Sequence, residues 1–319
     1  MRAFDPRRSL RKLVVLALVA ACGSSATMGG GIAGTSSVVA PISGFGSIIV
    51  GGIEFDTNGA LVTIEGDPAQ VSDLKLGMVA MVRGVVDPRG ARGVAQRVAV
   101  EHLAEGPLEA VDVAAGTISL LGQQIITNPA TVFDPTPLSQ LVQNEYIEVG
   151  GFFDASGRIR ATRVARKFQN LEIAVKGYVV GLDAQAGTFQ LGGLTVDFHS
   201  AIITGAPQGG LQNGLLVEVG ADVPPVGSVL SATDVDVKNP SAIADEGDGL
   251  KVEGFVTQIS SPTVLEVNRN QRVQLTPKTR FEHGSPGDLV LDAHVDIDGV
   301  AGADATLVAT KVDFLPPGS

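Results

Sequence analysis

The chain has 319 residues, of which 44% are hydrophobic and 18% are charged, and its formal net charge is -11. This composition excludes a disordered chain, and 40 glycines without a period of three exclude a collagen. The single cysteine excludes an intramolecular disulfide and a cysteine-rich zinc site, and the absence of tryptophan removes the best stacking residue for sugars and bases. The negative charge argues against nucleic acid as a partner, because phosphate binding depends on lysine and arginine.

Residues 1–21 have the pattern of a secretory signal peptide. An apolar run from Leu13 to Ala21 is too short to span a membrane as a helix. The cations that precede it are Arg7, Arg8, Arg11 and Lys12. We therefore predict that residues 1–21 are removed on export. The paired arginines leave the twin-arginine route open as an alternative, although Arg11 stands where that signal prefers an apolar residue.

The apolar run ends in Leu18-Val19-Ala20-Ala21-Cys22, which resembles the lipobox of bacterial lipoproteins. The resemblance implies that Cys22 becomes the mature N-terminus and carries acyl chains that anchor the protein in a membrane. Gly23 stands where an aspartate would retain an enteric lipoprotein at the inner membrane, so we expect the outer membrane, on its periplasmic side or at the cell surface. Residues 22–43 are predicted to form a flexible tether, because the segment from residue 23 to 37 is mostly glycine, serine, alanine and threonine.

The sequence after the tether repeats itself four times, at spacings of 66 to 77 residues. The clearest mark is an alanine, a polar residue, any residue and a valine, at 95–98, 161–164, 232–235 and 309–312. Each mark follows an alternating strand and a turn rich in glycine, proline or aspartate, which predicts a closing hairpin. The predicted strands are 78–82, 146–149, 215–219 and 294–297. Each repeat also opens with a hairpin, most clearly around Gly51-Gly52.

Helical signal is confined to Ser72–Gly77 and Pro137–Asn144, which lie between the opening and closing strands. A unit of about 65 residues with five or six short strands and one helical link is typical of a small β-barrel of the OB type. The expected fold class is therefore all-β, with four tandem OB-like barrels at residues 44–105, 106–170, 171–240 and 248–315. An open β-sandwich is the alternative, and a flexible joint is expected from Asn239 to Gly249.

The segment Pro41 to Val50 follows a glycine-rich lead, and the closing hairpin from Asp154 to Val164 ends in Ala-Thr-Arg-Val. Both segments resemble the bacterial lipoproteins built from tandem copies of the domain of unknown function five-six-six-six. The resemblance covers residues 44 to 315 and implies the fold and the envelope address. It implies no activity, because the family has none assigned. The third and fourth copies depart from it in their longer loops and in the loss of basic residues.

The sequence lacks the motifs of common enzyme classes, such as a Gly-x-Ser-x-Gly nucleophile elbow or a phosphate-binding loop. Its histidines occupy different places in their repeats and have no metal-ligand spacing, so they are expected at the surface or in loops. They are His102, His199, His283 and His294. We therefore predict no enzyme activity, no metal and no cofactor.

Two acidic clusters raise calcium binding as an alternative. They are Asp292, Asp296, Asp298 and Asp304, and separately Asp245, Glu246 and Asp248. Alternation along a strand favours a solvated face for the first cluster, and no glutamate completes a calcium-binding loop from it.

Five cations close together form a candidate anion-binding patch in an otherwise acidic chain. They are Arg158, Arg160, Arg163, Arg166 and Lys167. Such a patch could bind anionic lipid headgroups or lipopolysaccharide phosphates. An ordinary solvated pair of strands is the alternative that the alternation favours.

These observations predict a non-enzymatic, lipid-anchored protein of the bacterial cell envelope, whose repeats form a structural or ligand-presenting array. The expected partners are the membrane, through the lipid, and an unidentified envelope polysaccharide or protein. The alternative is a module that binds an oligosaccharide or a small polar ligand, as OB-type barrels often do. That alternative would require Tyr146, Phe152 and Phe153 to cluster on an exposed face, although phenylalanine in a closing strand is more often part of the core.

Overall fold

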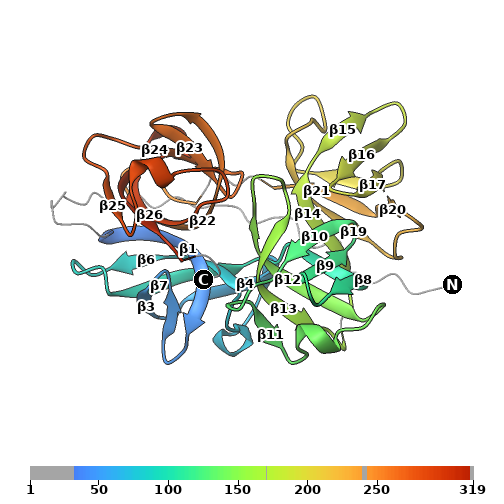
Figure 1. Cartoon of the computed structure of the whole chain (residues 1–319), viewed down its shortest axis with the longest axis horizontal. Coiled ribbons are helices and arrows are strands. Elements are labelled where there is room, and N and C mark those ends of the chain that lie inside the picture. Colours follow the sequence, from blue (N-terminus) through green and yellow to red (C-terminus); the bar gives the residue numbers. More distant parts are fainter. Residues whose placement is uncertain (1–31, 170, 239–242, 317–319) are drawn as a thin grey trace.

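The computed structural model describes residues 32–169, 171–238 and 243–316. Within these ranges the chain consists of β-strands with a few short 3-10 helices (Figure 1), so the predicted all-β class is confirmed. The expected signal peptide, Cys22 and the tether as far as residue 31 lie outside the described residues. No helix in the described ranges is long and apolar enough to cross a membrane.

The strands fall into four consecutive groups, which we call barrels 1 to 4. Barrel 1 comprises β1 (Gly34–Gly44), β2 (Ile48–Val50), β3 (Ile53–Asp56), β4 (Leu61–Ile64), β5 (Asp67–Pro68), η1 (Val71–Asp73), β6 (Val79–Val86) and β7 (Arg92–Val100). Barrel 2 comprises β8 (Ala104–Asp112), β9 (Thr117–Leu120), β10 (Gln123–Ile126), β11 (Val132–Asp134), η2 (Leu138–Gln140), β12 (Tyr146–Phe153) and β13 (Ile159–Arg166).

Barrel 3 comprises β14 (Ile173–Tyr178), β15 (Val180–Asp183), β16 (Thr188–Leu191), β17 (Leu194–Asp197), β18 (Ile202–Thr204), β19 (Leu216–Ala221), β20 (Val229–Ser231) and β21 (Asp234–Val237). Barrel 4 comprises β22 (Gly249–Ser261), β23 (Val264–Val267), β24 (Gln271–Gln274), β25 (Arg280–Glu282), η4 (Pro286–Asp288), β26 (His294–Ala301), η5 (Ala303–Ala305) and β27 (Leu307–Phe314). The helical turns predicted in barrels 1 and 2 are confirmed as η1 and η2.

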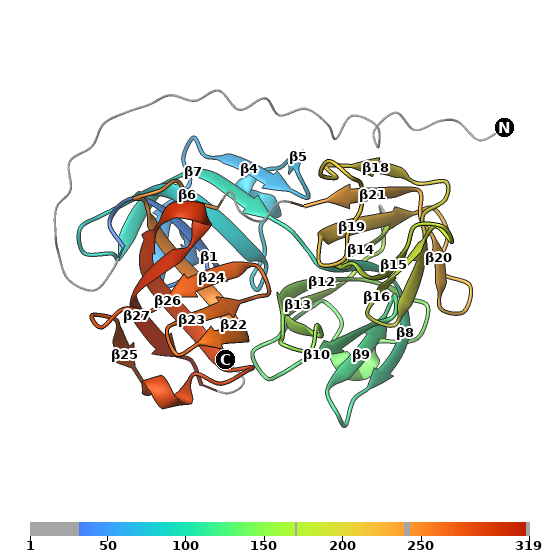
Figure 2. The ribbon, with the colours of Figure 1, turned by 90° about the horizontal axis from the view of Figure 1, so that it is seen from above.

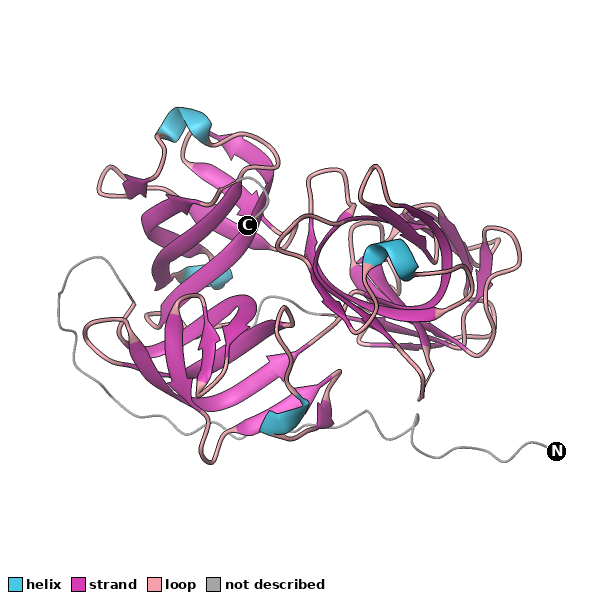
Figure 3. Cartoon of the chain, turned by 60° about the horizontal axis from the view of Figure 1, so that its bottom comes forward, coloured by secondary structure: helices cyan, strands magenta, loops and turns pink. Residues whose placement is uncertain are grey.

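The strand pairings of each group close into a ring. In barrel 1 the order around the ring is β1-β2-β3-β7-β6 and back to β1, and only β3 and β7 are parallel. A three-stranded meander whose third strand runs parallel to the fifth is the Greek-key order of the OB fold. Barrels 2 and 4 repeat this order, and the strands on the right of Figure 3 form such a ring seen along its axis. The pairings confirm the OB-like barrel and exclude the open β-sandwich.

Barrel 3 closes the same ring with interrupted strands. The strands β14 and β15 together take the place of the first strand, and β20 and β21 take the place of the last. The break in the last strand falls at Ala232-Thr233, inside the predicted Ala-x-x-Val mark. In the other three barrels this mark lies within one continuous strand.

The first strand of barrel 1 begins earlier than expected. Residues 34–43 were predicted as tether, but β1 starts at Gly34 and pairs with β6 from Gly34 to Pro41. The physical reason is the alternation of Val38, Ala40 and Ile42, whose side chains all point into the core and are fully buried. From Gly34 onward the predicted tether is therefore strand.

A β-bulge in the last strand of barrels 1, 2 and 4 lies opposite a glycine of the strand before it. The register shifts at Gly84, Gly151 and Gly299, which occupy equivalent positions in β6, β12 and β26. A β-carbon at any of these three positions would overlap a carbonyl oxygen of the last strand. Only glycine permits this close approach, and the bulge bends the strand so that the small barrel can close.

The barrels are joined in two pairs by strand pairing. Strand β1 of barrel 1 runs parallel to β22 of barrel 4, and β8 of barrel 2 runs antiparallel to β14 of barrel 3. Barrels 2 and 3 also share one hydrophobic core, whereas barrels 1 and 4 have separate cores. The four barrels form a two-by-two block, with barrels 4 and 3 above barrels 1 and 2 in Figure 1.

Polar contacts join the remaining neighbours. Between barrels 2 and 1, Thr162 donates a 2.7 Å hydrogen bond to the carbonyl oxygen of Gly77. Between barrels 3 and 4, the Tyr178 hydroxyl donates to the carbonyl oxygen of Arg269, whose guanidinium lies over the Tyr178 ring. Every barrel therefore contacts the next around the block.

The segment between barrels 3 and 4 was expected to be a flexible joint. Residues 239–242 lie outside the described residues. From Ile243 onward the segment contacts both neighbouring barrels: Asp245 and Asp248 form ion pairs with Arg83 of barrel 1, and Ile243 packs against the core of barrel 4. Flexibility of this joint stays a prediction.

Candidate functional site

A cavity of about 500 Å³ lies where barrels 1, 2 and 4 meet. Barrel 1 contributes Ile42 and Leu76, barrel 2 contributes Phe152 and Ala161, and barrel 4 contributes Phe255 among other residues. The volume lies within the range of roughly 300–1,000 Å³ that is usual for pockets of small-molecule ligands. No single repeat could form this cavity, because its wall combines residues from three barrels.

The acidic part of the wall comes from two neighbouring strands of barrel 4. Glu253 on β22 lies directly opposite Asp296 on β26, and Phe255 lies opposite His294 two residues further along. Side chains two residues apart on a strand share a face, so these four side chains project together, and all four line the cavity. The Nε2 atom of His294 is 3.3 Å from Oε1 of Glu253.

An aromatic stack borders the same wall. The rings of Phe255 and His294 are stacked, with their centroids 4.5 Å apart and an interplanar angle of 12°. The guanidinium of Arg160, from β13 of barrel 2, lies 5.4 Å from the centroid of Phe255. Arg160 is held in place by Asp154, whose Oδ2 accepts a 3.1 Å hydrogen bond from its Nε. The stack therefore joins barrels 2 and 4 across the cavity.

Buried lysine and aspartate side chains lie behind the acidic wall. Lys251 Nζ is 2.6 Å from Oδ2 of Asp296 and 2.8 Å from Oδ1 of Asp298, and Lys311 approaches the other oxygen of Asp298 at 3.1 Å. Burial raises the pKa of Asp296 to about 6, although Lys251 opposes the shift, and Asp298 and Glu253 add to it. The pKa of Lys251 is raised because both aspartates outweigh the effect of its burial.

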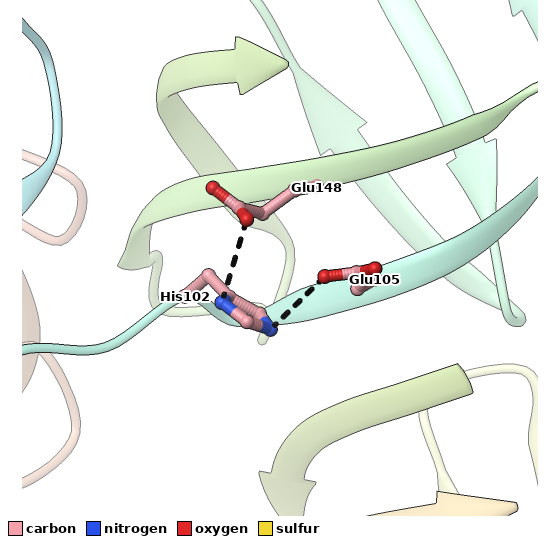
Figure 4. Close-up of side chains that lie close together, drawn as sticks. All are labelled: His102, Glu105 and Glu148. Carbon is pink, nitrogen blue, oxygen red and sulfur yellow. Dashed lines mark ion pairs between the residues drawn. The ribbon is translucent and has the colours of Figure 1, made fainter. Parts of the chain in front are cut away.

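A second cluster, His102, Glu105 and Glu148, is the one group of residues in the described ranges whose ligand atoms could surround a metal ion. Figure 4 shows the imidazole between the two carboxylates, with His102 Nε2 3.9 Å from Glu105 Oε2 and Nδ1 4.0 Å from Glu148 Oε2. However, Lys167 Nζ lies 3.3 Å from Glu105 and 3.0 Å from Glu148. Its ammonium group already provides the positive charge that the carboxylates need, so the geometry is that of an ion-pair network.

This network continues into barrels 1 and 3. Lys176 Nζ is 2.6 Å from Oε2 of Glu65, which lies in the turn between β4 and β5, and 3.2 Å from Oε2 of Glu101. Lys238 binds Glu218 at 2.6 Å on the neighbouring strands of barrel 3. In Figure 2 the hairpin of β4 and β5 lies on the side of barrel 1 that faces barrel 3, where Lys176 of β14 reaches Glu65. The network therefore joins three barrels at their common junction.

The charges of this junction shift one another's pKa values. Burial raises the pKa of Glu105, although Lys167 opposes the shift. Burial would also raise the pKa of Glu148, but His102 and Lys167 outweigh it and lower that pKa. The pKa of Lys176 is raised well above its ordinary value, because Glu65 and Glu101 outweigh complete burial. All these shifts except that of Glu105 favour the charged form, as expected for a paired ionic junction.

The five cations predicted as an anion-binding patch each have an acidic neighbour. Arg158 and Arg160 approach Asp154 and Asp292, Arg163 binds Asp134, Arg166 binds Glu145, and Lys167 binds Glu105 and Glu148. Only Arg160 lines the cavity. Arg163 is buried, and its guanidinium donates to the carbonyl oxygen of Leu76 across the seam with barrel 1. Arg158, Arg160 and Arg163 thus help to join barrel 2 to its neighbours, whereas Arg166 and Lys167 are paired within barrel 2, and anion binding by these residues stays a prediction.

The structure corrects two other expectations. His102 lies in the loop between β7 and β8, and His199 and His283 are exposed, as expected, whereas His294 is a largely buried residue of β26 and contradicts the expectation. The expectation that Asp296 and Asp298 lie on a solvated face is wrong, because Lys251 and the packing of β22 against β1 cover this face. Within the described ranges, neither acidic cluster that suggested calcium gathers its ligand atoms as His102, Glu105 and Glu148 do.

The aromatic candidates are buried rather than clustered at the surface. Phe152 and Phe153 are about 95% buried, and Tyr146 is half-buried, which confirms the expectation that phenylalanine in a closing strand belongs to the core. Glu253 and Lys251 were not predicted from the sequence as parts of a site. The available signal was their alternation with Leu250 and Val252 in β22, but such alternation usually marks a solvated face.

Comparison with known protein families matches residues 37–99, 105–165 and 253–313 to the domain of unknown function DUF5666. These three segments make up more than half of the chain. The chain belongs to the DUF5666 family. The match corrects the predicted number of family domains from four to three, because residues 171–240 are not matched. Barrel 3 nevertheless closes the same ring as the three DUF5666 domains, with a last strand that is broken in two.

A solved structure is also similar to this DUF5666 protein. The solved structure "drosophila Unr CSD456" is similar over 67% of this chain and 97% of that chain, at 14% sequence identity and a TM-score of 0.18. A TM-score this low does not allow the arrangement of the barrels in the two chains to be compared. No curated protein matches the chain.

Proposed function

We propose that this DUF5666 protein is a non-enzymatic, lipid-anchored protein of the bacterial cell envelope that holds a small ligand between barrels 1, 2 and 4. The observation that carries the proposal is the cavity of about 500 Å³. Its wall combines apolar side chains with a few charged groups, which is the usual composition of a ligand pocket. The barrels would serve as a rigid frame that keeps this cavity open.

The address rests on the sequence. Cys22 follows a lipobox-like segment, and acylation there would anchor the protein in the outer membrane, as proposed from Gly23. The residues between Cys22 and β1 would then leave a short spacer between the lipid and barrel 1. The four barrels would remain in the aqueous envelope or at the cell surface.

The cavity wall supports binding rather than catalysis. Its two hydroxyl groups are engaged with the backbone, because Thr162 donates to the carbonyl oxygen of Gly77 and Ser43 donates to that of Ile49 at 3.3 Å. A nucleophilic hydroxyl would instead lie within hydrogen-bond reach of a general base. The arrangement therefore supports a non-enzymatic ligand site.

A structural array without a ligand is the second candidate. It is favoured by the ion-pair junction around Lys176, which joins barrels 1, 2 and 3 without forming an open site. The two candidates differ in one respect, because only the first requires the cavity to be occupied in the cell.

The deciding experiment is native mass spectrometry of the full chain purified from membranes in a mild detergent. We expect a bound small molecule in the wild type and its loss in Ala130→Trp, because Ala130 is exposed and lines the cavity. Ala114→Trp is the matched control, since Ala114 is exposed in a turn of the same barrel and does not line the cavity. A wild-type protein free of small molecules, or equal retention in both variants, would favour the structural array.

A further inference from the structure

We propose that the ligand of this cavity is an organic cation with an apolar body, whose ammonium group lies between Glu253 and Asp296. The inference rests on the ligand-binding function proposed above and names the chemical class of the ligand. It is carried by the arrangement of charges on the barrel 4 wall and by the apolar surface that faces it.

The two carboxylates lie side by side without a cation that serves both. Glu253 and Asp296 are direct partners on adjacent antiparallel strands, where like charges repel. The Oδ1 atom of Asp296 is buried and has no hydrogen-bond partner in the described part of the chain. A buried acceptor without a donor is costly, so a donor supplied by a ligand would stabilise this wall.

The lysines behind the wall do not remove this demand. Lys251 divides its ammonium group between Asp296 and Asp298, and Asp298 also binds Lys311. The positive charges of these two lysines and the negative charges of the two aspartates cancel, and the negative charge of Glu253 remains. The neighbour of Glu253 is His294, which is positively charged only when it is protonated. The wall therefore carries a net demand for positive charge when His294 is neutral.

The rest of the cavity suits an apolar body. Phe152, Ile42 and Leu76 line the walls contributed by barrels 1 and 2. Arg160 is the cation on the cavity wall, but Asp154 and Asp292 lie beside its guanidinium. It is thus already neutralised and does not make the cavity attractive to an anion.

A metal ion is a poorer fit than an organic cation. Among the described residues, only His102, Glu105 and Glu148 bring ligand atoms within 4.8 Å of one another, and they lie in the ion-pair junction. The acidic wall of the cavity offers no such close set. A volume of about 500 Å³ with apolar sides would also leave most of the space beside a metal ion unfilled.

The test compares three probes of nearly equal size on the purified full chain by isothermal titration calorimetry near neutral pH. The probes are 4-phenylbutylamine, 4-phenylbutanol and 4-phenylbutyrate, which are cationic, neutral and anionic. We expect the amine to bind at least about tenfold more tightly than the alcohol, because a charge-assisted hydrogen bond to a buried carboxylate is about twice as strong as a neutral one. The butyrate should bind most weakly.

Variants assign the preference to the two carboxylates. Glu253→Gln and Asp296→Asn should each reduce the amine's advantage over the alcohol, whereas Glu246→Gln, an exposed residue outside the cavity wall, should leave it unchanged. Ala130→Trp should weaken all three probes. Retention of the full preference in both cavity variants would overturn the assignment to Glu253 and Asp296.

The outcomes also separate this inference from the proposed function. If the alcohol or the acid binds as tightly as the amine, and Ala130→Trp still weakens binding, the cationic class is wrong and the cavity remains a ligand site. If no probe binds at millimolar concentration, the proposal that the ligand is an organic cation is overturned, but the proposed ligand-binding function is not. The bound molecule sought by native mass spectrometry then decides the proposed function independently.

Discussion

The ammonium nitrogen of Lys176 lies 2.6 Å from Oε2 of Glu65, and this ion pair joins barrel 3 to barrel 1. Lys176 is buried and also donates to the carbonyl oxygen of His102 at 2.9 Å, in the segment that leads into barrel 2. One side chain thus contacts all three barrels that meet at the junction.

Replacing this lysine should strongly destabilise the block. In Lys176→Met the carboxylate of Glu65 loses its ammonium partner and keeps only its contacts with His102 among the described residues, and breaking a buried ion pair typically costs about 3 kcal/mol or more. The free energy of unfolding, measured by urea titration, should fall accordingly. Lys278→Met is the control, because Lys278 is exposed and has no ion pair in the described part of the chain. Equal effects of the two changes would show that the junction contributes no stability.

The stability of barrel 4 should depend on pH through Asp296. Its pKa in the folded chain is about 6, above the ordinary value of 3.8, so the folded state binds more protons than the unfolded state between these values. Stability should therefore fall as the pH rises from about 4 to about 6, and the loss should be complete above that range. Asp296→Asn should flatten this part of the profile in thermal melting experiments. A profile identical to that of the wild type would contradict the assignment.

Two adjacent glycines of β12 should respond differently to substitution. A β-carbon at Gly151 would overlap the carbonyl oxygen of Arg160, whereas at Gly150 the nearest atom is 4.0 Å away. Gly151→Ala should cost about 1–3 kcal/mol through overpacking, and Gly150→Ala should have little effect. Thermal melting of the two variants provides a comparison at neighbouring positions. Similar melting temperatures would mean that the bulge can relax without cost.

Loss of the proposed acylation site should release the protein from the membrane. Cys22→Ala should move the full chain from the membrane fraction to the soluble fraction, because stable anchoring depends on the acyl chains. Cell fractionation with an antibody against the barrels measures the distribution. Continued membrane association of Cys22→Ala, at wild-type levels, would reject the lipid anchor.

Much of each repeat could be predicted from local sequence. Alternating apolar residues and glycine-rich turns placed the hairpin of β2 and β3 and the closing strands β6, β12, β19 and β26 close to their observed positions. The beginning of barrel 1 was predicted wrongly. Pro41 cannot donate a backbone hydrogen bond to a sheet, and the residues before it are rich in glycine and serine, so the sequence did not indicate that β1 begins at Gly34.

The candidate site could not be predicted in the same way. Glu253 and Asp296 lie more than 40 residues apart, and either one alone fits the pattern of a solvated strand. The burial of Lys176 and Arg163 could not be predicted from the sequence either, because a charged residue is buried only when distant partners neutralise it.

The sequence by itself determined the all-β class, the repeated hairpins and the lipoprotein-like N-terminus, because alternation, turns and a signal pattern are local properties of the chain. Only the tertiary structure decided how the barrels pair, through β1 with β22 and β8 with β14, and which charges meet at their seams. The physical reason is that seams and cavities arise from contacts between residues far apart in sequence. The acidity that argued against a nucleic-acid partner is thus partly internal, and it forms the acidic wall of the cavity and the ion-pair junction.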